Sequence, residues 1–86
     1  MNGLRDDVWK KRGELLKSAR VAKGLLQKDV GKVLGVKGNT IAGYEAGSRK
    51  IDIDDMITLC LFLGIDIALF CGINRKFKFV KIENEN

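Results

Sequence analysis

Residues 27 to 45 read QKDVGKVLGVKGNTIAGYE, and this stretch predicts two short helices that meet at a tight turn. Each helix has one apolar face, and the two faces can pack against one another. The residues of this seam are Val30, Val33 and Leu34 in the first helix and Val36, Ile41 and Tyr44 in the second. A core this small leaves the second helix standing out from the domain, as the major groove of DNA requires.

Two glycines are expected to fix how these helices meet. Gly31 falls in the middle of the first helix, where a Cβ would hold the second helix away. Gly35 follows the last turn of that helix and can adopt the left-handed backbone conformation that ends it.

The flanks of this stretch add further positions of one known pattern. Before it stand Leu16, Arg20, Gly24, Leu25 and Gln27; at its end stand Tyr44, Glu45, Gly47, Arg49 and Lys50; after it comes a segment from Asp54 to Gly64 with Leu59, Leu61 and Leu63. With these positions in register, residues 16 to about 63 resemble the lambda-repressor/Cro-like (XRE) helix-turn-helix family. The resemblance implies a mainly α fold, a four-helix DNA-binding domain over residues 16–64 with its motif at 27–46.

Helices are expected over about 7–23, 27–34 and 39–46, and from a cap at Asp52 to Leu63. Residues 1–15 are expected to form an N-terminal extension and the start of the first helix. Gly13 weakens this helix and is a candidate for its true start. Asp52, with Asp55 three residues later, predicts a helix cap. Cys60 lies in the apolar fourth helix and is expected in the core.

Residues 65–86 are expected to form a dimerisation segment and tail. Apolar and other residues alternate from Ile65 to Asn74, and KFKFVKI at 76–82 is rich in β-branched and aromatic residues. This pattern favours a C-terminal β-hairpin or strand, and some antitoxin-type members of the family that it resembles dimerise through such strands. The alternative is a fifth helix at 66–71 with Asp66 as its N-cap.

Composition and charge agree with a small DNA-binding domain. The chain has 86 residues and a net charge of +5, and residues 16–50 alone hold eight basic residues against two acidic ones. The positive charge therefore coincides with the motif that would face phosphate. No apolar run is long enough to span a membrane, and the N-terminus lacks the apolar region of a signal peptide, so we expect a cytoplasmic protein.

Catalysis and cofactors find no support in the residue types present. The chain has no histidine, and its two cysteines, Cys60 and Cys71, are eleven positions apart with no ligand set nearby. We expect neither an enzyme nor a bound cofactor or metal.

The resemblance assigns DNA contacts to ten residues at the start of the second helix, along the third helix and just after it. They are Gln27, Lys28, Lys37, Gly38, Asn39, Thr40, Ala42, Gly43, Arg49 and Lys50. Gln27, Arg49 and Lys50 suit phosphate. Asn39 can bond adenine, or it merely caps its helix. In the family Arg20 and Glu45 pair as a salt bridge beneath the motif.

These residues predict a sequence-specific regulator of transcription that binds double-stranded DNA. Because one domain of this size reads few base pairs, we expect a homodimeric repressor on two half-sites. Gly38, Ala42 and Gly43 have no polar side chain, so direct base reading by the helix itself is sparse. The alternative function is a protein-interaction module or antitoxin whose C-terminal segment binds a partner such as a toxin.

Overall fold

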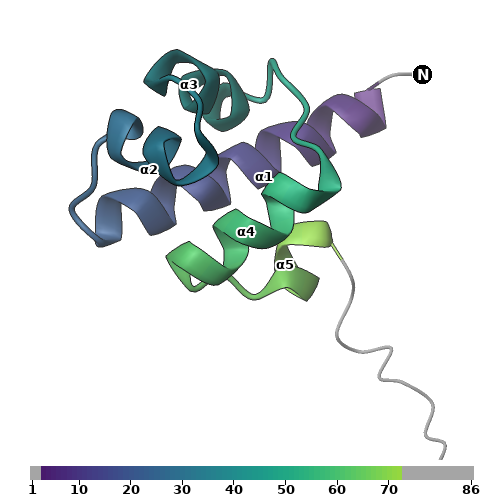
Figure 1. Ribbon diagram of the computed structural model, residues 1–86. Coiled ribbons are helices and arrows are strands. Elements are labelled where there is room, and N and C mark those ends of the chain that lie inside the picture. The colour runs from purple at the N-terminus through teal and green to yellow at the C-terminus, as the bar shows by residue number, and fades with distance from the viewer. Residues whose placement is uncertain (1–2, 73–86) are drawn as a thin grey trace, which may run out of the picture.

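The computed structural model describes residues 3–72, which form five helices and no strand (Figure 1). The helices are α1 (Gly3–Ala22), α2 (Gln27–Leu34), α3 (Gly38–Ala46), α4 (Ile53–Leu63) and α5 (Ile67–Cys71). The long α1 contacts α3, α4 and α5, while α2 packs against α3 and α4. The expected α-helical lambda-repressor-like fold is confirmed, with five helices where four were predicted, and α2 and α3 begin and end within one residue of their predicted bounds. Within residues 3–72 no helix has the length and apolar character to cross a membrane.

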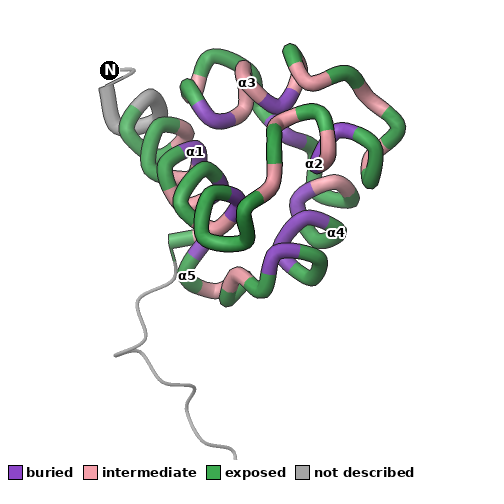
Figure 2. The backbone as a smooth tube through the Cα atoms, turned by 90° about the vertical axis from the view of Figure 1, so that its left-hand side faces the viewer, coloured by how far each residue is buried: buried purple, intermediate pink, exposed green. Residues whose placement is uncertain are grey.

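The centre of the core takes one fully buried side chain from each of the first four helices. These are Leu16, Val30, Ile41 and Leu59, each at most 1% exposed. Burying an aliphatic side chain of this kind contributes about 1.5–3 kcal/mol. Figure 2 shows buried stretches in every helix. The predicted apolar seam is confirmed except at Val33, which was assigned to the seam but is 38% exposed.

The turn between α2 and α3 is built on the two predicted glycines. A Cβ on Gly31 would lie 2.5 Å from the backbone oxygen of Val36, so any other residue would displace the turn that leads into α3. Gly35 ends α2 with a φ of 74°, in the left-handed region that favours glycine. Gly47 ends α3 in the same way, with a φ of 79°. Both roles expected of Gly31 and Gly35 are confirmed.

The start of α4 and the burial of its cysteine also follow the prediction. The Asp52 carboxylate accepts a hydrogen bond of 2.9 Å from the backbone N–H of Asp55, which caps the first turn. Cys60 is 2% exposed, and burial raises the pKa of its thiol. It is therefore a core residue.

The strand expected to begin at Ile65 is wrong, and the alternative fifth helix is present. The Asp66 carboxylate accepts from the N–H of Ala68 at 2.9 Å and so caps α5. Ile67 and Leu69, which belong to one set of the alternating residues, are 40% and 55% exposed, whereas Phe70, from the other set, is 2% exposed. The buried residue, Phe70, therefore does not belong to the same set of alternating positions as Ile67 and Leu69. The second expected strand, at 76–82, lies outside the described residues.

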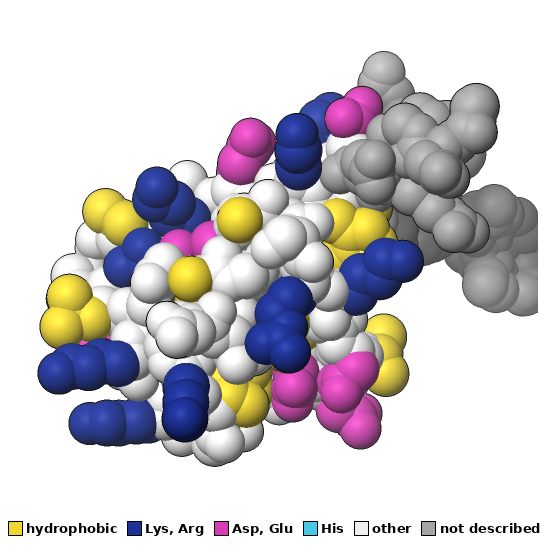
Figure 3. Space-filling view, turned by 90° about the horizontal axis from the view of Figure 1, so that it is seen from above, with side chains coloured by type: hydrophobic (Ala, Val, Ile, Leu, Met, Phe, Trp, Pro, Cys, Tyr) yellow, Lys and Arg dark blue, Asp and Glu magenta, His cyan; other side chains and the backbone are white. Residues whose placement is uncertain are grey.

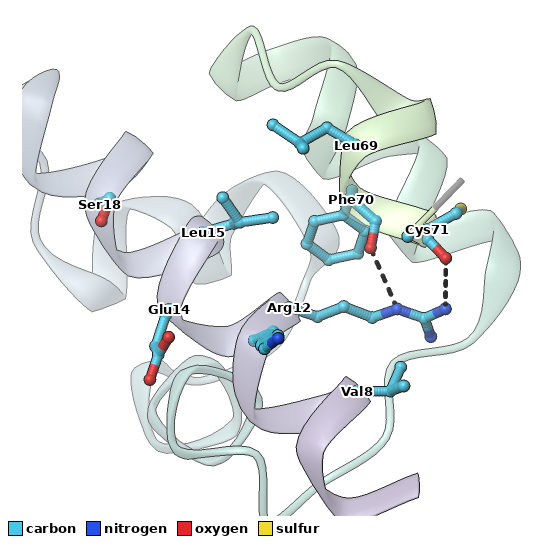
Figure 4. Close-up of a pocket in the computed structure, with 10 residues that line it drawn as sticks. Val8, Arg12, Glu14, Leu15, Ser18, Leu69, Phe70 and Cys71 are labelled. Atoms are coloured by element: carbon cyan, nitrogen blue, oxygen red, sulfur yellow. Dashed lines mark hydrogen bonds between the residues drawn. The ribbon is translucent and has the colours of Figure 1, made fainter. Parts of the chain in front are cut away.

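Arg12 fastens α5 to α1. Its Nε donates to the Phe70 backbone oxygen at 3.2 Å and its Nη2 to that of Cys71 at 3.4 Å (Figure 4). Its guanidinium carbon lies 4.7 Å from the centre of the Trp9 ring. A mainly apolar pocket of about 630 Å³ lies beside these contacts, between α1 and α5. Figures 1 and 2 place α5 at the opposite end of the molecule from α3, so this pocket is remote from the helix-turn-helix.

Candidate nucleic-acid interface

The inner face of α3 is held by a buried ion pair. Arg20 Nε donates to Glu45 Oε2 at 2.6 Å, and Arg20 Nη2 to Glu45 Oε1 at 3.1 Å. The third guanidinium nitrogen donates to the Leu25 backbone oxygen at 2.8 Å. The hydrogen bond to Glu45 and that carboxylate's charge raise the pKa of Arg20, against the opposing effect of burial. The predicted pair is confirmed, and it ties α3 to α1 beneath the motif.

Gln27 joins the same buried cluster. Its Nε2 donates to Glu45 Oε1 at 3.1 Å, so the side chain that begins α2 is anchored to α3. The bond uses one of its two amide hydrogens. A phosphate contact by Gln27 stays a prediction, and the remaining hydrogen would have to serve it.

The N-terminal end of α3 leaves Asn39 available. Lys37, in an extended backbone conformation and without a side-chain bond to the helix, is the N-cap residue. Asn39 is the second residue of the helix and is exposed, so the alternative that it merely caps the helix does not hold. Gly38 packs closely on α2, because a Cβ there would lie 3.2 Å from the backbone nitrogen of Lys28.

Basic side chains stand around the outer surface of α2 and α3. Figure 3 views this end of the molecule and shows Lys and Arg side chains over a largely uncharged surface, with most acidic side chains toward its edges. The exposed basic residues of α2, of the turn between α2 and α3, and of the loop after α3 are Lys28, Lys32, Lys37, Arg49 and Lys50. Such an arrangement attracts the phosphates of DNA.

Arg49 and two residues of α3 come together on the outer surface of that helix. Arg49 Nη1 donates to Thr40 Oγ1 at 3.3 Å. The stem of Arg49 lies over Gly43, where an added Cβ would stand 2.7 Å from Arg49 Cδ. Ala42, which lies between Thr40 and Gly43 in the sequence, is partly buried. Sequence reasoning named all four residues, but no sequence signal indicated that Arg49 lies back across the helix.

Gly13 is a structurally important residue whose role was misjudged. It does not mark the start of α1, which begins well before it, but lies buried where α1 crosses α3. A Cβ at this position would lie 2.5 Å from the backbone oxygen of Tyr44. The glycine therefore permits the close approach of these two helices, and a glycine inside a long helical pattern was the available signal.

Comparison with known proteins decides the family. The helix-turn-helix family HTH_3 matches residues 16–70. The chain belongs to this family. It is a DNA-binding regulator of the lambda-repressor (XRE) type. Among solved structures, the HTH_3 domain is similar to that of the restriction-modification controller protein C.AhdI from Aeromonas hydrophila, with a TM-score of 0.67, 26% sequence identity, and coverage of 76% of this chain and 94% of that one. No curated protein sequence matches the chain.

Within residues 3–72 of this HTH_3 protein, no group of three or more His, Cys, Asp or Glu residues is placed to hold a metal ion. The acidic residues Asp52, Asp54 and Asp55 gather at the start of α4, where burial and the two neighbouring charges raise the pKa of Asp55. This acidic edge borders the basic surface and would repel phosphate.

Proposed function

We propose that this HTH_3 protein is a site-specific repressor of transcription that inserts α3 into the major groove of double-stranded DNA. The observation that carries the proposal is the asymmetry of α3. Ile41 and Glu45 are buried, while Asn39 is exposed and follows the exposed Lys37 by two residues. A helix fixed from behind and flanked by positive charge has the properties that groove reading requires. The likeness to a restriction-modification controller supports a regulatory role.

Contacts to DNA divide into those that position and those that read. The exposed Lys28 and Lys50 lie on either side of α3 in sequence and suit phosphate. Asn39 can form the paired hydrogen bonds to adenine N6 and N7, and Ala42 can contact a thymine methyl group. Phosphate contacts of this kind make the logarithm of affinity fall with the logarithm of salt concentration by about 0.9 per phosphate.

The first experiment is fluorescence anisotropy with the duplex found upstream of the protein's own gene and a scrambled duplex, over a series of salt concentrations. Specific sites typically bind about 10³-fold or more tightly than non-specific DNA, and this gap should persist as salt rises. Asn39→Ala and Lys50→Glu should weaken binding to the specific duplex, with circular dichroism confirming an intact fold. Equal, salt-sensitive binding to both duplexes would contradict the proposal.

A homodimer is part of the same proposal, and an apolar stripe on α4 supports it. Ile53, Ile57 and Leu61 are spaced four residues apart and are therefore on one face of the helix. They are 61%, 41% and 79% exposed. A second copy of the chain that covers this stripe would bury it and would present two copies of α3 to half-sites about one helical turn apart.

Leu61→Glu tests the dimer by placing a charge in the stripe. We expect the sedimentation coefficient to fall to that of a monomer and cooperative binding to the two half-sites to be lost. The matched control is Val21→Glu, because Val21 is also exposed, at 56%, but belongs to α1. A dimer that survives Leu61→Glu unchanged would exclude this stripe as the interface.

The second hypothesis, a module that binds a partner protein such as a toxin, rests on residues 73–86, which lie outside the described part of the chain. It remains a prediction from sequence. Its test is co-purification of a stoichiometric partner that is lost when residues 73–86 are deleted.

A further inference from the structure

The outer surface of α3 has few side chains that can read a base. Ala42 and Gly43 have no polar side-chain atom, Gly38 packs on α2, and Asn39 can specify a single base pair. A regulator that finds its site needs more discrimination than this, since each mismatched base pair typically weakens binding by only about 5- to 150-fold. The question is which other group lies on that surface.

Arg49 lies there, although it comes from the loop after the helix. Its stem crosses α3 at Gly43, where a Cβ would stand 2.7 Å from Cδ and 2.9 Å from Cγ of the arginine. Its Nη1 then donates to Thr40 Oγ1 at 3.3 Å, three residues nearer the start of the helix. Gly43 therefore acts as a seat for the stem, and Thr40 orients the guanidinium.

We propose that Arg49 is the principal base-reading residue of this protein and that it recognises guanine in the major groove. This inference rests on the proposed insertion of α3 into that groove. Gly43 and Thr40 are positioning residues, because each acts through the arginine. Gly43 then contributes to base recognition, because the lack of a side chain there leaves room for the stem of Arg49.

Two features favour a base over a phosphate as the partner of Arg49. Asn39 and Gly43 are one turn apart on the same face of α3, so a side chain that crosses Gly43 lies between the helix and the base edges once α3 is in the groove. The bond to Thr40 uses one of the five guanidinium N–H donors, and a planar fork that is already oriented suits the O6 and N7 acceptors of guanine.

The test begins with selection of duplexes from a random pool by the purified full-length protein. Each guanine of the selected site is then replaced singly by 7-deazaguanine, which removes the N7 acceptor and keeps base pairing. At one position per half-site this replacement should weaken wild-type binding by roughly 5- to 150-fold. For Arg49→Ala the same replacement should have no effect, because the reading group is already gone.

Two further variants separate reading from attraction to phosphate. Gly43→Ala retains Arg49 but blocks its seat, and it should lose the preference for that guanine without a loss of thermal stability. Lys50→Ala is the control: it should weaken binding to all duplexes alike and reduce the salt slope by about 0.9, while the guanine preference remains.

The outcomes distinguish the assignment of Arg49 from the proposed function as a site-specific repressor. If Arg49→Ala still discriminates guanine from 7-deazaguanine, or weakens all duplexes alike as Lys50→Ala does, the assignment of Arg49 is overturned while the site-specific regulator stands. If the wild-type protein selects no sequence from the pool, both are overturned.

Discussion

The two faces of α3 differ in how their side chains are held. On the inner face Ile41 is fully buried, and Glu45 receives hydrogen bonds from Arg20 and Gln27. On the outer face Asn39 is exposed, and the longest side chain present belongs to Arg49, outside the helix. In this helix of nine residues, one face packs against the domain and the other face is available to contact DNA. Changes to the inner face should act on folding, and changes to the outer face on DNA binding.

The largest expected effect is on the inner face, from Glu45→Ala. It leaves the Arg20 charge buried without its partner, and breaking a buried pair from one side typically costs about 3–5 kcal/mol. Urea unfolding should show this loss in the free energy of unfolding. The double variant Arg20→Met/Glu45→Leu should lose less, because it removes both charges. A single-variant loss below about 1 kcal/mol would mean that the pair does not hold α3.

Gly13→Ala should come next. Alanine in a helix is usually more stable than glycine by about 1 kcal/mol. At Gly13 the sign should reverse, with a loss of about 1–3 kcal/mol, because the new Cβ would meet the backbone of Tyr44 and Glu45. Thermal unfolding would measure this loss. Ser18→Ala on the exposed side of α1 is the control and should not lower the melting temperature. A stabilised Gly13→Ala variant would show that α1 and α3 can separate at little cost.

Lys28→Ala, on the outer surface, should weaken DNA binding and leave the stability of the fold unchanged. Since Lys28 is exposed, its free energy of unfolding should change by no more than about 0.5 kcal/mol. The slope of log affinity against log salt should become shallower by about 0.9, the contribution of one phosphate contact. An unchanged slope would remove Lys28 from the interface.

The smallest effect concerns Tyr44 and appears only at alkaline pH. Burial, and after it the charge of Asp55, raise the pKa of Tyr44 above its usual value near 10. The folded state therefore holds this proton more tightly than the unfolded chain, and the stability that results is present at neutral pH and lost as pH rises through the pKa. Tyr44→Phe should show a smaller fall in stability between pH 8 and pH 11 than the wild type. Equal falls would contradict this linkage.

Most of the helical framework could be predicted from sequence because its signals are local. Apolar spacing placed α2 and α3 to within a residue, Gly31 and Gly35 marked the turn, and Asp52 marked the start of α4. The family resemblance supplied the Arg20–Glu45 pair. The DNA contacts assigned by resemblance stay predictions, although Asn39 proves to be exposed and free of a capping role.

The features that sequence reasoning missed depend on contacts between distant segments. Residues 65–72 alternate like a strand, but a helix of five residues is too short to display a 3.6-residue period. The burial of Phe70 and the bonds from Arg12, which hold this helix against α1, come from a distant segment. The close approach at Gly13 and the path of Arg49 over Gly43 likewise depend on where another segment of the chain happens to lie.

The short links between the helices and the absence of proline have a consequence for folding kinetics. The helices are joined by short links, and α2 and α3 stop at Gly35 and Gly47, while the whole chain contains no proline. Isomerisation of prolyl bonds, which takes about 10–100 s in other proteins, therefore cannot delay folding. Small helical domains dominated by local contacts fold in microseconds to milliseconds. A newly synthesised copy should thus reach its native state without help from a prolyl isomerase.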